Sequence, residues 1–138
     1  MKNVVRFISI IALLFVCIAS VQAKDKSDKT IYAFAYGTCF NDSVVYVSAI
    51  SELPEAVINS KTKFLENRQI YSNQFKQYLD ALNQGHAHTC AVFFDKKKDT
   101  LMKTLAKLRR NTARSKKTVT KLVEIAEADF KFSTIAQN

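Results

Sequence analysis

Two short and largely apolar stretches in the first half of the chain, separated by a polar pair, predict a β-hairpin. Residues 30–40 are rich in aromatic and small residues, and residues 43–50 are rich in Val and Tyr. Asn41-Asp42 between them suits a tight turn. The first strand would have two unequal faces, so a helix could approach closely on the small one. The bulky face carries Tyr32, Phe34, Tyr36, Thr38 and Phe40, and the small face carries Ile31, Ala33, Ala35, Gly37 and Cys39.

The residues after the hairpin have the apolar spacing of a helix. Pro54 suits the first turn of a helix because it lacks an N–H that would otherwise be unpaired. Asn59 and Ser60 could interrupt this helix or cap it again. From there apolar residues recur on one side of a helix that should stop at Gly85. Residues 89–94 form a β-type run, and Asp95 is a plausible cap for a second helix that continues to about Ser115. The apolar side of the first helix comprises Phe64, Tyr71, Phe75, Tyr78 and Leu82.

The last stretch, residues 119–132, has a broken period of two and predicts a final strand with a bulge near 126–128. The order of elements is therefore ββαβαβ. A helix that links the second and third strands makes them parallel, with the first strand between them and antiparallel to both. We expect a single α+β domain over residues 30–138, with a four-stranded antiparallel or mixed sheet and two helices packed on one face.

The first 23 residues are typical of a removable export signal. Lys2 and Arg6 precede an uncharged apolar stretch at residues 7–18, and Val21-Gln22-Ala23 has small residues where a cleavage site needs them. This apolar stretch is shorter than the roughly 20 residues of a spanning helix, and no second one follows. We expect a periplasmic or secreted protein that begins with a flexible leader at residues 24–29. A lipoprotein attached through Cys17 is the alternative, although Val16 is larger than the residue that usually precedes such a cysteine.

Cleavage would leave only two of the three cysteines, Cys39 and Cys90. Cys39 lies near the end of the first strand and Cys90 near the start of the third, and antiparallel neighbours bring these ends together. An oxidising compartment favours a disulfide between them, whereas two buried free thiols are the alternative. Neither cysteine belongs to a CxxC pair, so a thioredoxin-like role has no support.

The stretch His86-Ala87-His88-Thr89-Cys90 offers the main alternative chemistry. In extended chain, residues two apart point the same way, so His86, His88 and Cys90 could converge on a soft divalent metal. A structural zinc site usually has four ligands, and Cys39 would have to supply the fourth. The two histidines could also act as bases beside Cys90, but no oxyanion-type motif accompanies them. We therefore expect no catalytic residues and no cofactor.

Positive charge is concentrated in the second predicted helix and the segment after it. The chain has 21 Lys and Arg against 12 Asp and Glu, and removal of Lys2 and Arg6 would leave a net charge of +7. Residues 96–121 alone carry 11 basic residues against Asp99, a net +10, so the rest of the processed chain is −3. At about 100° per residue, the helix presents a basic stripe opposite Leu101, Leu105 and Leu108. The proposed anion-binding residues on this stripe are Lys103, Lys107, Arg110 and Arg114.

Clustered Lys and Arg favour a polyanionic partner because binding releases counterions, although a solvated face that only maintains solubility is the alternative. Export makes nucleic acid an unfavourable partner and leaves an anionic envelope component or an acidic protein. The helix has too few large apolar residues on its outer side to insert into a bilayer. We expect a non-catalytic binding or interaction module, with the metal protein or enzyme as its alternative.

Four segments, taken in order, resemble those of a group of short exported bacterial proteins with no assigned activity. The resemblance covers most of the chain after residue 23 and implies a Gram-negative cell envelope setting. It implies no catalytic residues. The segments are 32–36 (YAFAY), 40–46 (FNDSVVY), 61–65 (KTKFL) and 88–90 (HTC).

Overall fold

The structure is a computed structural model, and we consider the unit formed by Ile31–Asn138. It describes residues 30–53, 55–115 and 121–135. The predicted signal peptide (1–23), the leader (24–29), Cys17 and Pro54 lie outside the described residues.

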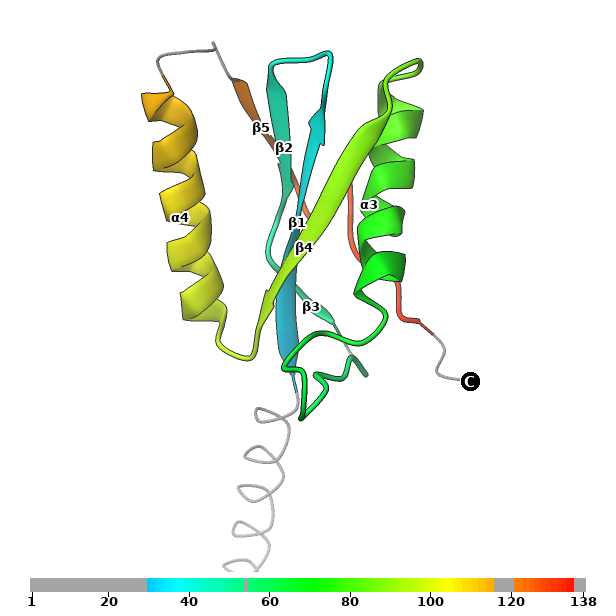
Figure 1. Cartoon of the computed structure of the whole chain (residues 1–138), viewed down its shortest axis with the longest axis vertical. Helices are drawn as coiled ribbons and strands as arrows, with labels where there is room; N and C mark the ends of the chain where they lie inside the picture. Colours follow the sequence, from blue (N-terminus) through cyan, green and yellow to red (C-terminus); the bar gives the residue numbers. More distant parts are fainter. Residues whose placement is uncertain (1–29, 54, 116–120, 136–138) are drawn as a thin grey trace, which may run out of the picture. The chain divides into compact units, whose positions relative to one another are not determined.

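The described residues form five strands and two helices (Figure 1). Their order agrees with the predicted ββαβαβ, with one additional short strand after the hairpin, and the fold class α+β is confirmed. The elements are β1 (Ile31–Cys39), β2 (Val44–Ser48), β3 (Ser51–Leu53), α3 (Arg68–Leu82), β4 (His88–Asp95), α4 (Lys98–Arg114) and β5 (Lys121–Ile125).

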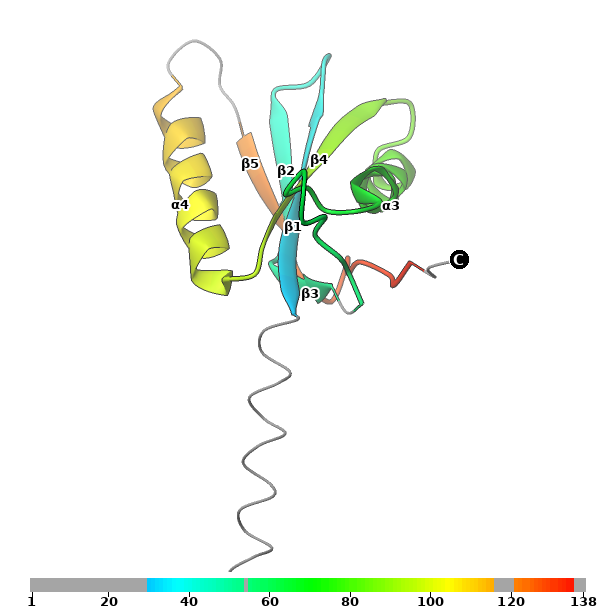
Figure 2. The same ribbon diagram turned by 60° about the horizontal axis from the view of Figure 1, so that its bottom comes forward.

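Strand β1 is the centre of the sheet, as the sequence predicted. It pairs antiparallel with β4 on one side and antiparallel with β2 and β3 on the other. Strand β5 pairs parallel with β2, which makes the sheet mixed. Strands β2, β4 and β5 therefore share one direction, and α3 and α4 are the crossovers between them (Figure 2).

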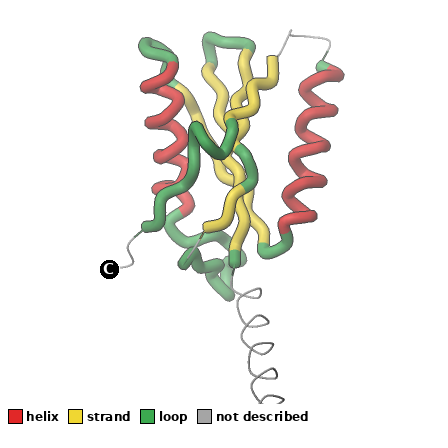
Figure 3. Tube along the Cα trace, turned by 180° about the vertical axis from the view of Figure 1, so that it is seen from behind, coloured by secondary structure: helices red, strands yellow, loops and turns green. Residues whose placement is uncertain are grey.

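The two helices cover opposite faces of the sheet, so the prediction of two helices on one face is wrong. Ala33 and Ala35 of β1 lie in a buried cluster with Phe75 of α3, whereas Phe34 lies in a second cluster with Leu101 of α4. The sheet separates the helices in the front and rear views (Figures 1 and 3). The physical reason is the direction of the crossovers. From β2 to β4 the chain moves one way across the sheet, and from β4 to β5 it moves back, so two right-handed crossovers must use different faces.

The small face of β1 allows α3 to approach closely, as predicted. A Cβ atom placed on Gly37 would lie 2.5 Å from Cδ1 of Leu79 and 3.3 Å from Cε1 of Phe75. Both of these helix side chains are fully buried. Any larger residue at this position would force the Leu79 side chain to move, so glycine leaves room for the helix.

Residues 55–67 form turns instead of the predicted start of a helix. Asn59 Oδ1 accepts hydrogen bonds from the backbone N–H groups of Lys61 (2.9 Å) and Thr62 (3.0 Å), which holds the chain in a local turn. Helix α3 begins at Arg68, after Asn67 with a left-handed φ of 56°. Side-chain hydrogen bonds to the backbone explain why the helix starts later than the apolar spacing suggested.

The predicted last strand is shorter in the structure. Strand β5 ends at Ile125, and the chain then turns back so that Phe130 and Phe132 pack against α3. The ring centroid of Phe130 lies 4.9 Å from that of Phe75, and the centroid of Phe132 lies 5.8 Å from that of Tyr71. The two phenylalanines complete the core on the α3 face without belonging to the sheet.

Candidate functional site

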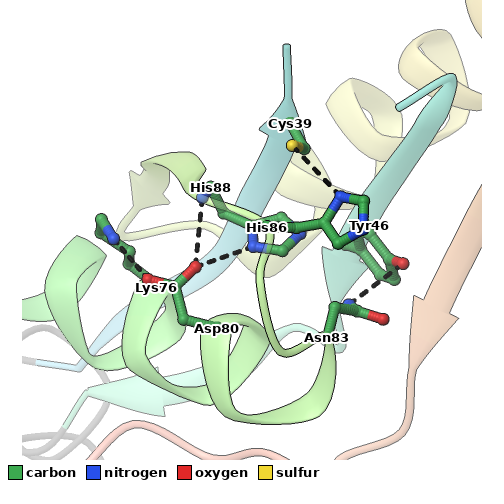
Figure 4. Close-up of polar contacts among 7 residues, drawn as sticks. All are labelled: Cys39, Tyr46, Lys76, Asp80, Asn83, His86 and His88. Atoms are coloured by element: carbon green, nitrogen blue, oxygen red, sulfur yellow. Dashed lines mark hydrogen bonds and ion pairs between the residues drawn. The ribbon is translucent and has the colours of Figure 1, made fainter. Parts of the chain in front are cut away.

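Histidine and cysteine residues gather where β1 ends and β4 begins, beside the C-terminal end of α3 (Figure 4). The pairing of β1 with β4 places Cys39 opposite His88 and Gly37 opposite Cys90. His86 lies in the connection before β4 and is exposed. The residues that the sequence singled out are therefore neighbours, but the structure gives them different partners.

His88 is buried and fixed by α3. The residue is only 3 % exposed, and its Nδ1 lies 2.8 Å from Oδ1 of Asp80. The same oxygen accepts a hydrogen bond from the backbone N–H of His88 at 3.1 Å. The rings of His88 and Tyr46 lie at 80° to each other, with centroids 5.6 Å apart. His88 is thus the buried first residue of β4. Histidines that directly follow a helix-ending glycine are more often exposed loop residues.

Asp80 connects this histidine to a surface lysine. Its second carboxylate oxygen forms an ion pair with Nζ of Lys76, one helical turn earlier in α3. The hydrogen bonds from Lys76 and His88 lower the pKa of Asp80 from its usual 3.8 to about 2, because both stabilise the ionised carboxylate. An ionised Asp80 only accepts hydrogen bonds, so Nδ1 of His88 is the donor.

The second ring nitrogen of His88 has no hydrogen-bond partner among the described residues. Its Nε2 atom is buried. A general base must come within hydrogen-bond reach of the proton it removes, and this nitrogen does not face solvent. His88 and Asp80 are arranged like a general base and the carboxylate that orients it. In this protein their hydrogen bonds instead connect α3 to β4.

Cys39 and Cys90 are free thiols in the structure. The register displaces them by two positions along neighbouring strands, and such diagonal positions have Cα atoms about 7–8 Å apart. Disulfides usually need Cα separations of about 4.4–6.8 Å. The predicted Cys39–Cys90 bond is therefore not formed here, and forming it would require a movement of β1 or β4. The antiparallel neighbourhood of their strands, from which the bond was predicted, is confirmed.

The thiol of Cys90 is not prepared for nucleophilic chemistry. Burial raises the pKa of Cys90 to about 11, and the negative charge of Asp80 acts in the same direction. A reactive cysteine has a lowered pKa, because the thiolate is the nucleophile. Cys39 Sγ lies 3.8 Å from Nδ1 of His86, a contact at the exposed end of the strand.

The arrangement does not support the metal alternative built on His86, His88 and Cys90. Among residues 30–53, 55–115 and 121–135, no group of three or more His, Cys, Asp or Glu side chains could hold a metal ion. His88 binds Asp80 and His86 contacts Cys39, so the two histidines turn to different neighbours.

The basic face predicted on the second helix is present on α4. Lys103, Lys107, Arg110 and Arg114 are exposed, whereas Leu101 is buried against the sheet. None of the four cations forms an ion pair with another side chain that the structure describes. We call these four residues the α4 basic face. Its charges are open to solvent and to any partner.

A fifth cation on α4, Arg109, differs because it is paired. Its Nε donates to Oε1 of Glu124 at 2.5 Å, and its Nη2 donates to Oε2 at 3.1 Å. This fork joins α4 to β5, and the hydrogen bonds with Glu124 raise the pKa of Arg109. The structure therefore distinguishes Arg109, which joins α4 to β5, from the four cations of the α4 basic face.

Several residues of these sites could not be found from the sequence. Asp80 and Lys76 are spaced as an ordinary helical ion pair, and only the fold brings Asp80 to His88. Tyr46 accepts a hydrogen bond from Nδ2 of Asn83 at 3.2 Å, and no local signal links these two residues either. The α4 basic face was visible because it follows from helical periodicity alone.

Comparisons with known proteins gave no match to a family model, to a curated protein or to a solved structure. No helix in the described part of the chain is both long and apolar enough to cross a membrane.

Proposed function

We propose that this protein is an exported, non-catalytic binding module that uses the α4 basic face to hold an anionic component of the cell envelope. The observation that carries the proposal is the set of four exposed cations on one side of α4 with no described ion-pair partner. A row of such charges along one helix favours a partner with repeated negative groups, because each contact releases counterions.

Two further features support a binding role over catalysis. His88 is buried and burial raises the pKa of Cys90, so these two residues provide neither an accessible base nor an activated nucleophile. The α4 basic face, in contrast, lies on a long helix that is anchored to the sheet through Leu101, Leu105 and the Arg109–Glu124 fork. The charges are thus held on a rigid element, which limits the entropy lost when a partner binds.

Export is the second part of the proposal and depends on residues 1–23. The charged start, the apolar stretch and the small residues before Lys24 support it. N-terminal sequencing of the protein recovered from its own cells should then begin at Lys24. A mature protein that retains Met1 would contradict export by cleavage.

The anion-binding role is tested by replacing the α4 basic face. In the variant Lys103→Gln, Lys107→Gln, Arg110→Gln and Arg114→Gln, retention on a dextran sulfate matrix should end at a much lower salt concentration than for the wild type. Retention of the wild type should itself fall steeply with salt, because screening acts on exposed charges.

A matched control separates the α4 basic face from net charge. Substitution of four exposed basic residues elsewhere removes the same charge, so this variant should elute close to the wild type. Equal loss in both variants would show that retention follows net charge alone and would contradict the proposal. The control positions are Lys61, Lys63, Arg68 and Lys131, each changed to Gln.

A further inference from the structure

A groove lies between α4 and the ends of β2 and β5. It has a volume of about 670 Å³, within the range of about 300–1,000 Å³ that small-molecule sites occupy. Strand residues from β2 and β5 line one wall, and Met102, Leu105 and Ala106 of α4 line the other. The lining is predominantly apolar. This groove is separate from the histidine and cysteine cluster, which lies on the α3 side.

Small and exposed side chains of α4 border the groove. Ala106 offers only a methyl group, and Met102 is 54 % exposed although it is a large apolar residue. Lys98, Met102, Ala106 and Arg109 follow each other at helical spacing along this flank, next to the α4 basic face. An exposed methionine in an apolar groove is typical of a surface that adapts to a bound apolar chain.

Charge at the rim indicates the chemistry of the occupant. Lys98 and Arg109 are the cations among the lining residues, and Glu124 is the anion. Because Glu124 is bound by Arg109, Lys98 remains without an ion pair among the described side chains. The groove therefore combines an apolar channel with one free positive charge.

We propose that this groove binds a single-chain anionic amphiphile of the fatty acid class, with the chain against Met102 and Ala106 and the carboxylate at Lys98. The apolar lining favours burial of a hydrocarbon chain, and the uncompensated Lys98 selects a negative head group over a neutral one. This site is independent of the α4 basic face, so each can fail without the other.

The probe is dodecanoate below its micellar concentration, measured by isothermal titration calorimetry with the purified protein. We expect one dodecanoate per chain, weaker binding of dodecyl maltoside, which has the same chain and a neutral head, and no binding of butyrate. Lys98→Gln should weaken dodecanoate binding about three- to fivefold, as expected for one exposed ion pair, and leave dodecyl maltoside unchanged. Equal binding of butyrate would overturn the proposal.

Two substitutions in the groove and one outside it make the test specific. Ala106→Trp fills the groove and should abolish binding of both dodecyl ligands, whereas Ala113→Trp, on an exposed part of the same helix, should not. Met102→Glu changes an exposed side chain, which keeps the fold, and should repel dodecanoate. Unchanged dodecanoate binding in either groove variant would overturn the proposal.

The fourfold Gln variant of the α4 basic face should still bind one dodecanoate, which distinguishes failure of this site from failure of anion binding.

Discussion

Gly37 lies beneath α3, where an added methyl group would press against Leu79. Its replacement tests how tightly β1 and α3 pack. Gly37→Ala would place Cβ 2.5 Å from Leu79 and 3.1 Å from Sγ of Cys90. We expect this substitution to lower the free energy of unfolding by about 1–3 kcal/mol, as for other overpacked cores. Urea denaturation followed by circular dichroism measures this loss.

The same contact predicts coupling between Gly37 and Leu79. Leu79→Ala alone should destabilise by about 2–5 kcal/mol because it leaves a cavity. In that background Gly37→Ala should cost less, since the new methyl group enters the vacated space. Equal costs of Gly37→Ala in both backgrounds would show that the helix and strand do not meet as described.

Asp80 predicts a specific loss of stability in acid. Because its pKa is about 2 in the folded protein and near 3.8 when unpaired, stability from the ionised carboxylate is present above about pH 4. This stability should be lost as the pH falls from about 4 towards 2. Asp80→Asn should be less stable than the wild type at pH 6 and should lack this part of the acid-induced loss.

An exposed turn residue provides the control for Asp80. Asp42→Asn makes the same chemical change away from His88, so the acid-induced loss of stability should match that of the wild type. If Asp80→Asn follows the wild-type curve between pH 6 and pH 2, the ion pair with Lys76 and the contact with His88 do not support the fold.

Cys90 is expected to react slowly with alkylating reagents. With a pKa of about 11, almost none of this thiol is ionised near neutral pH. Iodoacetamide at pH 7.5 should therefore modify native Cys90 far more slowly than the unfolded protein, as followed by mass spectrometry. Rapid labelling of Cys90 in the folded protein would restore the nucleophile interpretation.

At the scale of elements, the sequence predicted what depends on local periodicity. Helix α4 ends as predicted, and its basic and apolar sides follow from spacing of 3.6 residues per turn. The predicted cap was wrong, because Asp95 ends β4 and the helix begins at Lys98 with Lys97 as its N-cap. The predicted helical start after Pro54 was wrong, whereas the interruption at Asn59 that the sequence allowed is present as a turn held by the Asn59 side chain. Residues in β1 were assigned to the correct faces, because alternation in a strand needs no knowledge of its neighbours.

The relations between elements were harder to predict. The position of β5 beyond β2 decides that α4 must cover the face opposite α3, and apolar spacing does not reveal that position. The offset of Cys39 and Cys90 has a similar origin. A shift of two residues keeps every side chain on its face, so alternation alone cannot distinguish a direct pair from a diagonal one.

For the whole molecule, the arrangement divides structural and binding roles between the two sides of the sheet. The α3 side holds the aromatic core and the hydrogen bond between Asp80 and the buried His88, while the α4 side carries the α4 basic face and the apolar groove. The cations of α4 lie on one side of the sheet and create a positive field there, which steers anionic partners toward α4.

A residue-resolved NMR titration of the protein with dextran sulfate oligosaccharides tests whether the α4 basic face holds the anion. We expect the backbone amide shifts to gather around Lys103, Lys107, Arg110 and Arg114 and to disappear at roughly 1 M salt, where the Debye length is about 3 Å. Shifts centred on residues 61–68, or spread evenly over the surface, would contradict a binding role for the α4 basic face.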